Sequence, residues 1–267
     1  MRKSLLLTAV LGALYMPAVS FAEDAAPAAA EPASPHTFTY NMGLYSQYIF
    51  RGLTQTSQRP AIQGGADYSH SSGLYAGVWG SNISWLEDGG VYENSSLEFD
   101  IYGGYASTIG ETGLGYNVGV LQYIYPGDKI NPAFRNAETT EVYGSLSYKW
   151  LQAKLSVVAS DGAFGLKNAD GSYYAELNAN YPIGGSGYTI NAHVGRQDFS
   201  GKTEGAKNDL GSYTDYKLGV TKSWSNGVNV GGYYTDTNGR DSFYGDALFA
   251  GGGIADDQFT VFVQKTF

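Results

Sequence analysis

The sequence predicts an all-β fold: a transmembrane, antiparallel up-and-down β-barrel of about 12 strands, with short periplasmic turns and longer extracellular loops. Three observations lead to it. Segments of about ten residues alternate apolar and polar side chains along the chain, as strands with one lipid-facing and one water-facing side do. Short and long connections alternate between these segments. The chain ends on such a segment, and its last residue, Phe267, is aromatic.

The start of the chain predicts export. Residues 1–22 have the order of a secretory signal peptide, with two basic residues, an apolar run over 5–16 and small residues at 20–22. The apolar run is too short to span a membrane as a helix. Residues 23–36 are rich in Ala, Pro and Glu without a hydrophobic period, which predicts a disordered periplasmic lead-in. Residues 37–267 remain as one outer-membrane barrel domain.

The composition narrows the class of protein. The chain has 37 Gly and 23 Tyr, only 15% charged residues and a mean hydropathy of −0.24, which suits a wall one residue thick between lipid and water. Cysteine is absent, so disulfide scaffolding and thiolate chemistry are excluded. A formal net charge of −9 disfavours nucleic acid and anionic lipid as electrostatic partners.

The predicted strands follow in order from the alternation. The first covers about residues 37–50, where Phe38, Tyr40, Met42, Leu44, Tyr48 and Phe50 share one parity. The clearest later segments are 97–105, 114–120, 141–150, 173–181, 188–194 and 258–267. One such window is weak evidence for a strand, but their unbroken succession is strong.

The connections alternate in length. Short turns are predicted near 71–73, 109–113, 150–151, 184–187 and 225–227. Longer connections are predicted at 51–59, 86–94, 126–137, 161–171, 200–211 and 238–257. Asn226-Gly227 is the residue pair that tight hairpin turns favour, because both positions need positive φ. An even number of strands then leaves both ends of the barrel on the periplasmic side.

Aromatic residues gather beside the short turns. Those on the apolar parity are Tyr68, Tyr105, Tyr148, Trp150, Tyr181, Tyr188 and Trp224. They predict an aromatic girdle at the periplasmic interface, where a ring stays in the apolar layer and its polar atom reaches water.

The stretch from Gly43 to Ile83 carries the sharpest family resemblance. It contains Phe50-Arg51-Gly52-Leu53-Thr54-Gln55-Thr56, followed by Gln63-Gly64-Gly65. This resembles the TorF-type family of outer-membrane porins, in which a Phe-Arg-Gly-(Ile/Leu)-(Ser/Thr)-Gln-Thr step leads into a Gln-Gly-Gly hairpin. Residues 97–105, the Tyr125-Pro126-Gly127 step and the Gln-Lys-Thr-Phe ending resemble that family too. The resemblance implies passive passage of small hydrophilic solutes across the bacterial outer membrane.

The polar parity supplies the candidate pore-lining residues. They are Arg51, Asp67, Glu98, Asp100, Tyr102, Glu141, Lys154, Glu176, His193, Asp215 and Lys217. Acidic side chains outnumber basic ones, which predicts a weak preference for cations and neutral solutes. Two interpretations stay open: these charges line an aqueous path, or they pair across a narrow bore and fill it. Aromatic residues of this parity are expected to fill space rather than to stack on sugars.

Other functions have less support. The alternative is a closed barrel whose extracellular loops act as a binding or adhesion surface, favoured by the apolar residues of loop 238–257. An enzyme is not expected, because His193 lies on the polar parity without a nucleophile motif around it. No His or Cys spacing predicts a metal site, and no cofactor is expected. The expected partners are outer-membrane lipid, small solutes and the barrel-insertion machinery, with Phe267 as the assembly signal.

Overall fold

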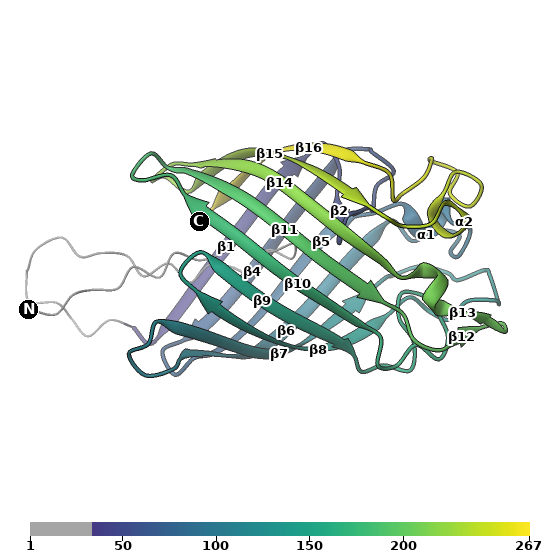
Figure 1. Ribbon diagram of the computed structural model, residues 1–267, viewed down its shortest axis with the longest axis horizontal. Helices are drawn as coiled ribbons and strands as arrows, with labels where there is room; N and C mark the ends of the chain where they lie inside the picture. The colour runs from purple at the N-terminus through teal and green to yellow at the C-terminus, as the bar shows by residue number, and fades with distance from the viewer. Residues whose placement is uncertain (1–33) are drawn as a thin grey trace, which may run out of the picture.

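The computed structural model of the protein describes residues 34–267, so the predicted signal peptide and most of the predicted lead-in lie outside the described residues. Within these residues twelve antiparallel strands form a closed barrel, as the sequence predicts (Figure 1). The strands are β1 (His36–Tyr45), β4 (Ala61–His70), β5 (Leu74–Asn82), β6 (Leu97–Thr108), β7 (Leu114–Ile124), β8 (Thr139–Tyr148), β9 (Leu151–Val158), β10 (Tyr173–Pro182), β11 (Tyr188–Asp198), β14 (Tyr213–Ser223), β15 (Val228–Thr237) and β16 (Gln258–Thr266). Each pairs with its neighbours along the chain, and β1 pairs with β16.

The two ends of the barrel differ as predicted. Short turns at 71–73, 109–113, 149–150, 183–187 and 224–227 form one end, called here the turn end, where the first and last strands also begin and finish (Figure 1). The other end, the loop end, carries connections 46–60, 83–96, 125–138, 159–172, 199–212 and 238–257. Their short elements are β2 (Ile49–Phe50), β3 (Leu53–Thr54), α1 (Trp85–Asp88), β12 (Lys202–Thr203), β13 (Ala206–Lys207), η1 (Asn208–Gly211) and α2 (Asp241–Tyr244).

Among residues 34–267, no helix combines the length and the apolar character needed to cross a membrane.

The outer face of the barrel is apolar around its circumference. Ile101, Leu218 and Phe259, on three different strands, are 54%, 62% and 65% exposed. The predicted girdle lies at the turn end, where Trp150 and Tyr181 are exposed and meet edge to face at 5.7 Å. Because a water-soluble monomer does not leave so large a continuous apolar surface exposed, this face is built for an apolar surrounding.

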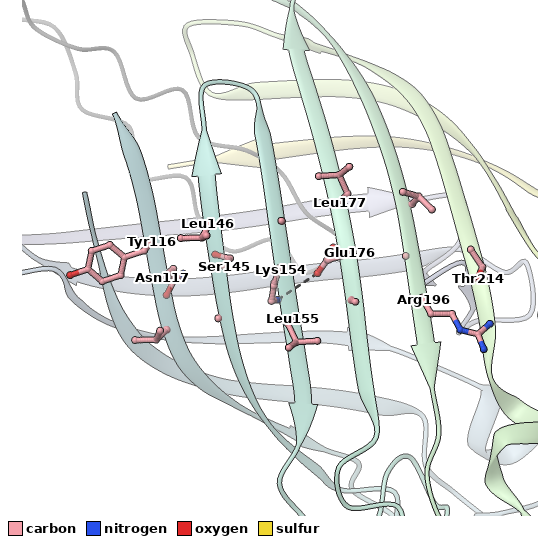
Figure 2. Close-up of a pocket in the computed structure, with 16 residues that line it drawn as sticks. Tyr116, Asn117, Ser145, Leu146, Lys154, Leu155, Glu176, Leu177, Arg196 and Thr214 are labelled. Atoms are coloured by element: carbon pink, nitrogen blue, oxygen red, sulfur yellow. Dashed lines mark ion pairs between the residues drawn. The ribbon is translucent and has the colours of Figure 1, made fainter. Parts of the chain in front are cut away.

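A shallow apolar groove marks the outer wall over β8, β9 and β10. Its lining includes the small residues Gly144, Ala153 and Ala175. Leu146, Leu155 and Leu177 line it as well (Figure 2). Figure 2 also shows Lys154 and Glu176, which alternate with these residues along their strands and are joined by an ion pair. The alternation of the pleat therefore separates an apolar exterior from a charged interior within one thickness of chain.

The first strand is shorter than predicted. The sequence predicts a strand to about Phe50, but β1 ends at Tyr45, and the next residues form the small β2–β3 hairpin. Tyr48 and Phe50 continue the apolar alternation of β1, yet they are only 4% and 8% exposed, whereas Leu44 is 59% exposed. A period of two residues fits both a wall strand and an extended segment folded back inside the barrel.

The seam of the barrel lies between β1 and β16. Their register runs from Asn41 opposite Thr266 to Tyr45 opposite Phe262. Phe267 extends the pairing by one residue, because its backbone N–H donates to the Tyr40 carbonyl at 2.8 Å and its carbonyl accepts from the Tyr40 N–H at 3.4 Å. The last residue of the chain is therefore part of the closure.

Candidate functional site

The interior of the barrel is polar and unevenly filled. In the loop-end half, Asp100, Tyr123 and Thr260 have no exposed surface. Towards the turn end, interior side chains such as Asn117 and Ser145 keep part of their surface exposed. The interior is therefore packed in one half and partly accessible in the other.

Connection 46–60, called here the inward loop, fills the packed half. It leaves the wall along β16, where the Ser46 N–H donates to the Val261 carbonyl at 2.9 Å and the Gln47 amide donates to Gln258 at 3.2 Å. Its tip, Arg51-Gly52, takes left-handed backbone conformations with φ of +47° and +81°.

The tip rests against the inner face of β14 and β15. A Cβ atom on Gly52 would lie 2.6 Å from Asp215 Cβ and 2.6 Å from Thr237 Cγ2, on β14 and β15. Only a residue without a side chain lets the loop approach the wall so closely, and glycine also has no penalty for positive φ. The Phe-Arg-Gly step is thus the point at which the chain crosses the interior.

The Arg51 side chain spans the rest of the interior. It is 4% exposed, and its guanidinium donates to Glu141 Oε2 and to Gln197 Oε1, both at 2.7 Å. The same group lies 4.3 Å from the ring centroid of Tyr174 and 3.4 Å from the Tyr123 hydroxyl. These four wall residues, on β7, β8, β10 and β11, are called here the guanidinium seat. Charge-assisted bonds and a ring face together hold the plane of the cation.

Acidic side chains next to the seat outnumber Arg51. Glu98 accepts a hydrogen bond from the Tyr48 hydroxyl of the inward loop at 2.9 Å. Asp100 is wholly buried, and neither of its carboxyl oxygens has a hydrogen-bond partner among the described residues. It lies within electrostatic range of Glu98, Glu141 and Arg51. Glu141 thus contacts the guanidinium directly, and Glu98 and Asp100 lie beside this pair.

A second buried network lies on β10, β11 and β14. His193 contacts Asp215 Oδ1 at 2.9 Å, the Tyr174 hydroxyl at 2.9 Å and Asn178 Oδ1 at 2.7 Å. Each of these partners faces the interior, and no serine hydroxyl is among the partners found for His193 in residues 34–267. The ring therefore belongs to a polar network of the interior.

The remaining candidates lie on the same inner face. Lys154 Nζ lies 3.9 Å from Glu176 Oε1, and Lys217 Nζ lies 5.6 Å from the ring centroid of Tyr233. Asp67 accepts a hydrogen bond from the Tyr102 hydroxyl, which crosses from β6 to β4. All the predicted pore-lining residues thus face the interior, and most of them, though not Asp100, take part in hydrogen bonds, ion pairs or cation–ring contacts there. Whether they line a conducting path stays a prediction.

Several residues of the site were not predicted. Gln197 has the same inward parity as His193. It could have been predicted by extending the strand 188–194 by three residues. Tyr48 was assigned to the lipid-facing parity, which is wrong, because it points into the interior and binds Glu98. Nothing in the local pattern marks the chain as leaving the wall at Ser46.

The inward loop is also tied to connection 83–96 outside the barrel. Asp88 accepts hydrogen bonds from the Ser57 hydroxyl and the Arg59 guanidinium, both at 2.6 Å. Burial alone would raise the pKa of the Asp88 carboxyl. Hydrogen bonds from Ser57 and Ser84 and the charge of Arg59 outweigh burial and hold this pKa below its ordinary value.

Within residues 34–267, no group of three or more His, Cys, Asp or Glu side chains has an arrangement that could hold a metal ion.

Three solved structures show what the barrel resembles. A KdgM porin in complex with disordered oligogalacturonate matches with a TM-score of 0.49 and 8% identity, over 86% of this chain and 98% of the porin. The COG4313 outer membrane channel from Pseudomonas putida F1 matches with a TM-score of 0.46 and 11% identity, over 89% and 100% of the two chains. The outer membrane protein opdK from Pseudomonas aeruginosa matches with a TM-score of 0.40 and 14% identity, over 86% and 66%.

Sequence comparison identifies the family. No curated protein matches the chain significantly. The resemblance to TorF-type porins is not confirmed by the matches and stays a prediction. A family model described as "Bacterial protein of unknown function (Gcw_chp)" matches residues 29–267, which covers all the described strands. The chain therefore belongs to the Gcw_chp family of bacterial proteins.

Proposed function

We propose that this protein is an outer-membrane porin that gives small hydrophilic solutes passive passage, with a weak preference for cations and neutral solutes. The apolar outer face, the aromatic residues at the turn end and the long loops at the other end support a place in the bacterial outer membrane. The observation that carries the function is the charged interior, which holds the acid-rich cluster around Arg51 and becomes partly accessible towards the turn end.

The inward loop sets the narrowest point of the proposed path. Its tip touches β14 and β15, and the Arg51 side chain reaches β8 and β11. A solute passes only where this side chain gives way, so small openings and low conductance are expected. Because acidic residues outnumber basic ones beside this point, they favour cations electrostatically.

Conductance of the refolded barrel in a planar bilayer tests the proposal. Residues 23–267 are expected to give stable steps with modest preference for K⁺ over Cl⁻. Glu98→Gln with Asp100→Asn is expected to lower this preference, and Glu98→Lys with Asp100→Lys to shift it towards Cl⁻. Glu111→Lys with Asp170→Lys adds the same charge at two exposed positions outside the interior and is the matched control.

Silence of the inserted protein and of an Arg51→Asn variant would contradict a pore. It would favour the second candidate, a closed barrel that presents its loops as a binding surface. The observation that favours this second candidate is that side chains fill the loop-end half of the interior. Among the apolar residues of loop 238–257, Leu248 is 50% exposed, whereas Tyr244 is 5% exposed and packs edge to face on Tyr213.

A further inference from the structure

We infer that the guanidinium seat recognises solutes that carry a guanidinium group, and that Arg51 occupies the seat as an intramolecular stand-in for such a solute. The inference rests on the proposed porin function and names its solute class. In this arrangement the inward loop closes the path, because the guanidinium of Arg51 fills the site that a solute guanidinium would bind.

The seat matches a planar cation in three ways. Glu141 and Gln197 accept hydrogen bonds from two different nitrogens of one guanidinium, both at 2.7 Å. Tyr174 offers its ring to the face of the group at 4.3 Å. A guanidinium combines spread in-plane donors with a weakly hydrated face, whereas Na⁺ and a primary ammonium lack that face.

A second observation, on Asp100, supports a site for further positive charge beside the seat. Asp100 is fully buried with both carboxyl oxygens unpartnered among the described residues, although Tyr48 binds its neighbour Glu98. A buried carboxylate without a partner is costly, and a cation beside it removes that cost. The acidic residues Glu98, Asp100 and Glu141 therefore offer more than a binding site for Arg51, because Arg51 leaves Asp100 without a hydrogen-bond partner.

The Arg51 side chain can leave the seat without a change in the strands that form the wall. Tyr123, Glu141, Tyr174 and Gln197 lie on strands whose backbones are paired on both sides. Arg51 comes from the tip of the short β2–β3 hairpin, where two residue pairs, Ile49–Thr54 and Phe50–Leu53, join the strands. Withdrawal of one side chain vacates the seat while its ligands keep their positions.

Substitution of Arg51, followed by addition of guanidinium as a free ion, tests the inference. Arg51→Asn empties the seat, and Asn tolerates the left-handed backbone of this position. Conductance of this variant is measured in KCl while guanidinium chloride, tetramethylammonium chloride or NaCl replaces part of the salt at constant chloride. Guanidinium is expected to block at concentrations at least about ten-fold lower than tetramethylammonium, which has no N–H donor for Glu141 or Gln197.

Further variants assign the block to the seat. In Arg51→Asn with Glu141→Gln the guanidinium block is expected to weaken by about ten-fold, because the acceptor loses its charge. Glu111→Gln in the Arg51→Asn background changes an exposed turn residue and is expected to leave the block unchanged. Circular dichroism and insertion into liposomes confirm that each variant is folded.

The outcomes separate the inference from the function it rests on. A block of equal strength by guanidinium and tetramethylammonium, or one that survives Glu141→Gln, would overturn the inference and leave the porin standing. Absence of conductance from the wild-type protein and from every folded Arg51 variant would instead remove the porin itself. Faster entry of methylguanidinium than of tetramethylammonium into liposomes holding the wild-type barrel is the result expected in the native protein.

Discussion

At the scale of single residues, Gly52 carries the tightest constraint at the crossing point of the interior. Its φ of +81° disfavours any side chain, and a Cβ atom there would also overlap Asp215 and Thr237 at 2.6 Å. We expect Gly52→Ala to lower the free energy of unfolding by about 2–4 kcal/mol, as the sum of backbone strain and overpacking. Urea unfolding of the barrel in detergent micelles or vesicles measures this loss.

Gly205 provides the matched control for Gly52. It has a φ of +86° in a loop, and a Cβ atom there would meet nothing within 4 Å. Gly205→Ala is expected to cost only the backbone term of about 1 kcal/mol. Equal losses at the two positions would show that the contact with β14 and β15 contributes nothing.

At the scale of elements, the inward loop is held at both of its ends. Asp88, in the short helix α1, ties it to connection 83–96 through Ser57 and Arg59. We expect Asp88→Asn to make the peptide bonds near Arg59 more accessible to proteinase K, a protease of broad specificity, since the charge-assisted bonds are lost. Glu87→Gln, at the exposed neighbouring position, is expected to leave the rate of cleavage unchanged.

The same anchor predicts a pH dependence. The pKa of the Asp88 carboxyl is lower in the folded protein than in the unfolded chain. Its contribution is therefore fully present above the unfolded value of about 4 and is lost as the pH falls through the folded value. Faster cleavage of the wild-type loop below about pH 4 by an acid-active protease, with no such change in Asp88→Asn, is expected. A pH response that persists in Asp88→Asn would place the sensitive group elsewhere.

The elements also show what sequence patterns can and cannot predict. The wall was predictable because each strand has an apolar outer face and a polar inner face, so the alternation of residues 97–105 predicted β6 directly. The inward loop was not predictable, because Tyr48 and Phe50 alternate as wall residues do while their surroundings come from β6, β7 and connection 159–172. Arg51 was predicted to face the interior, but its seat joins residues up to 146 positions away in the chain. Only the closed topology brings them together.

At the scale of the whole molecule, closure depends on the last strand meeting the first. Phe267 contributes to it through its backbone, which exchanges two hydrogen bonds with Tyr40, while its ring is 67% exposed on the outer face. These two contributions can be separated. Phe267→Ala keeps the backbone bonds and removes the ring, whereas deletion of Phe267 removes both.

If the ring serves as the assembly signal, both variants are expected to reach the outer membrane of cells at several-fold lower levels, since the insertion machinery reads the side chain. In purified lipid, where no machinery acts, Phe267→Ala is expected to refold to the wild-type yield, and the deletion to unfold more easily by about 1–2 kcal/mol for its lost bonds. Phe259→Ala removes a ring that is 65% exposed on the same strand and is the matched control. Normal membrane levels of Phe267→Ala would show that the ring gives no signal and that the terminus acts through closure of the barrel alone.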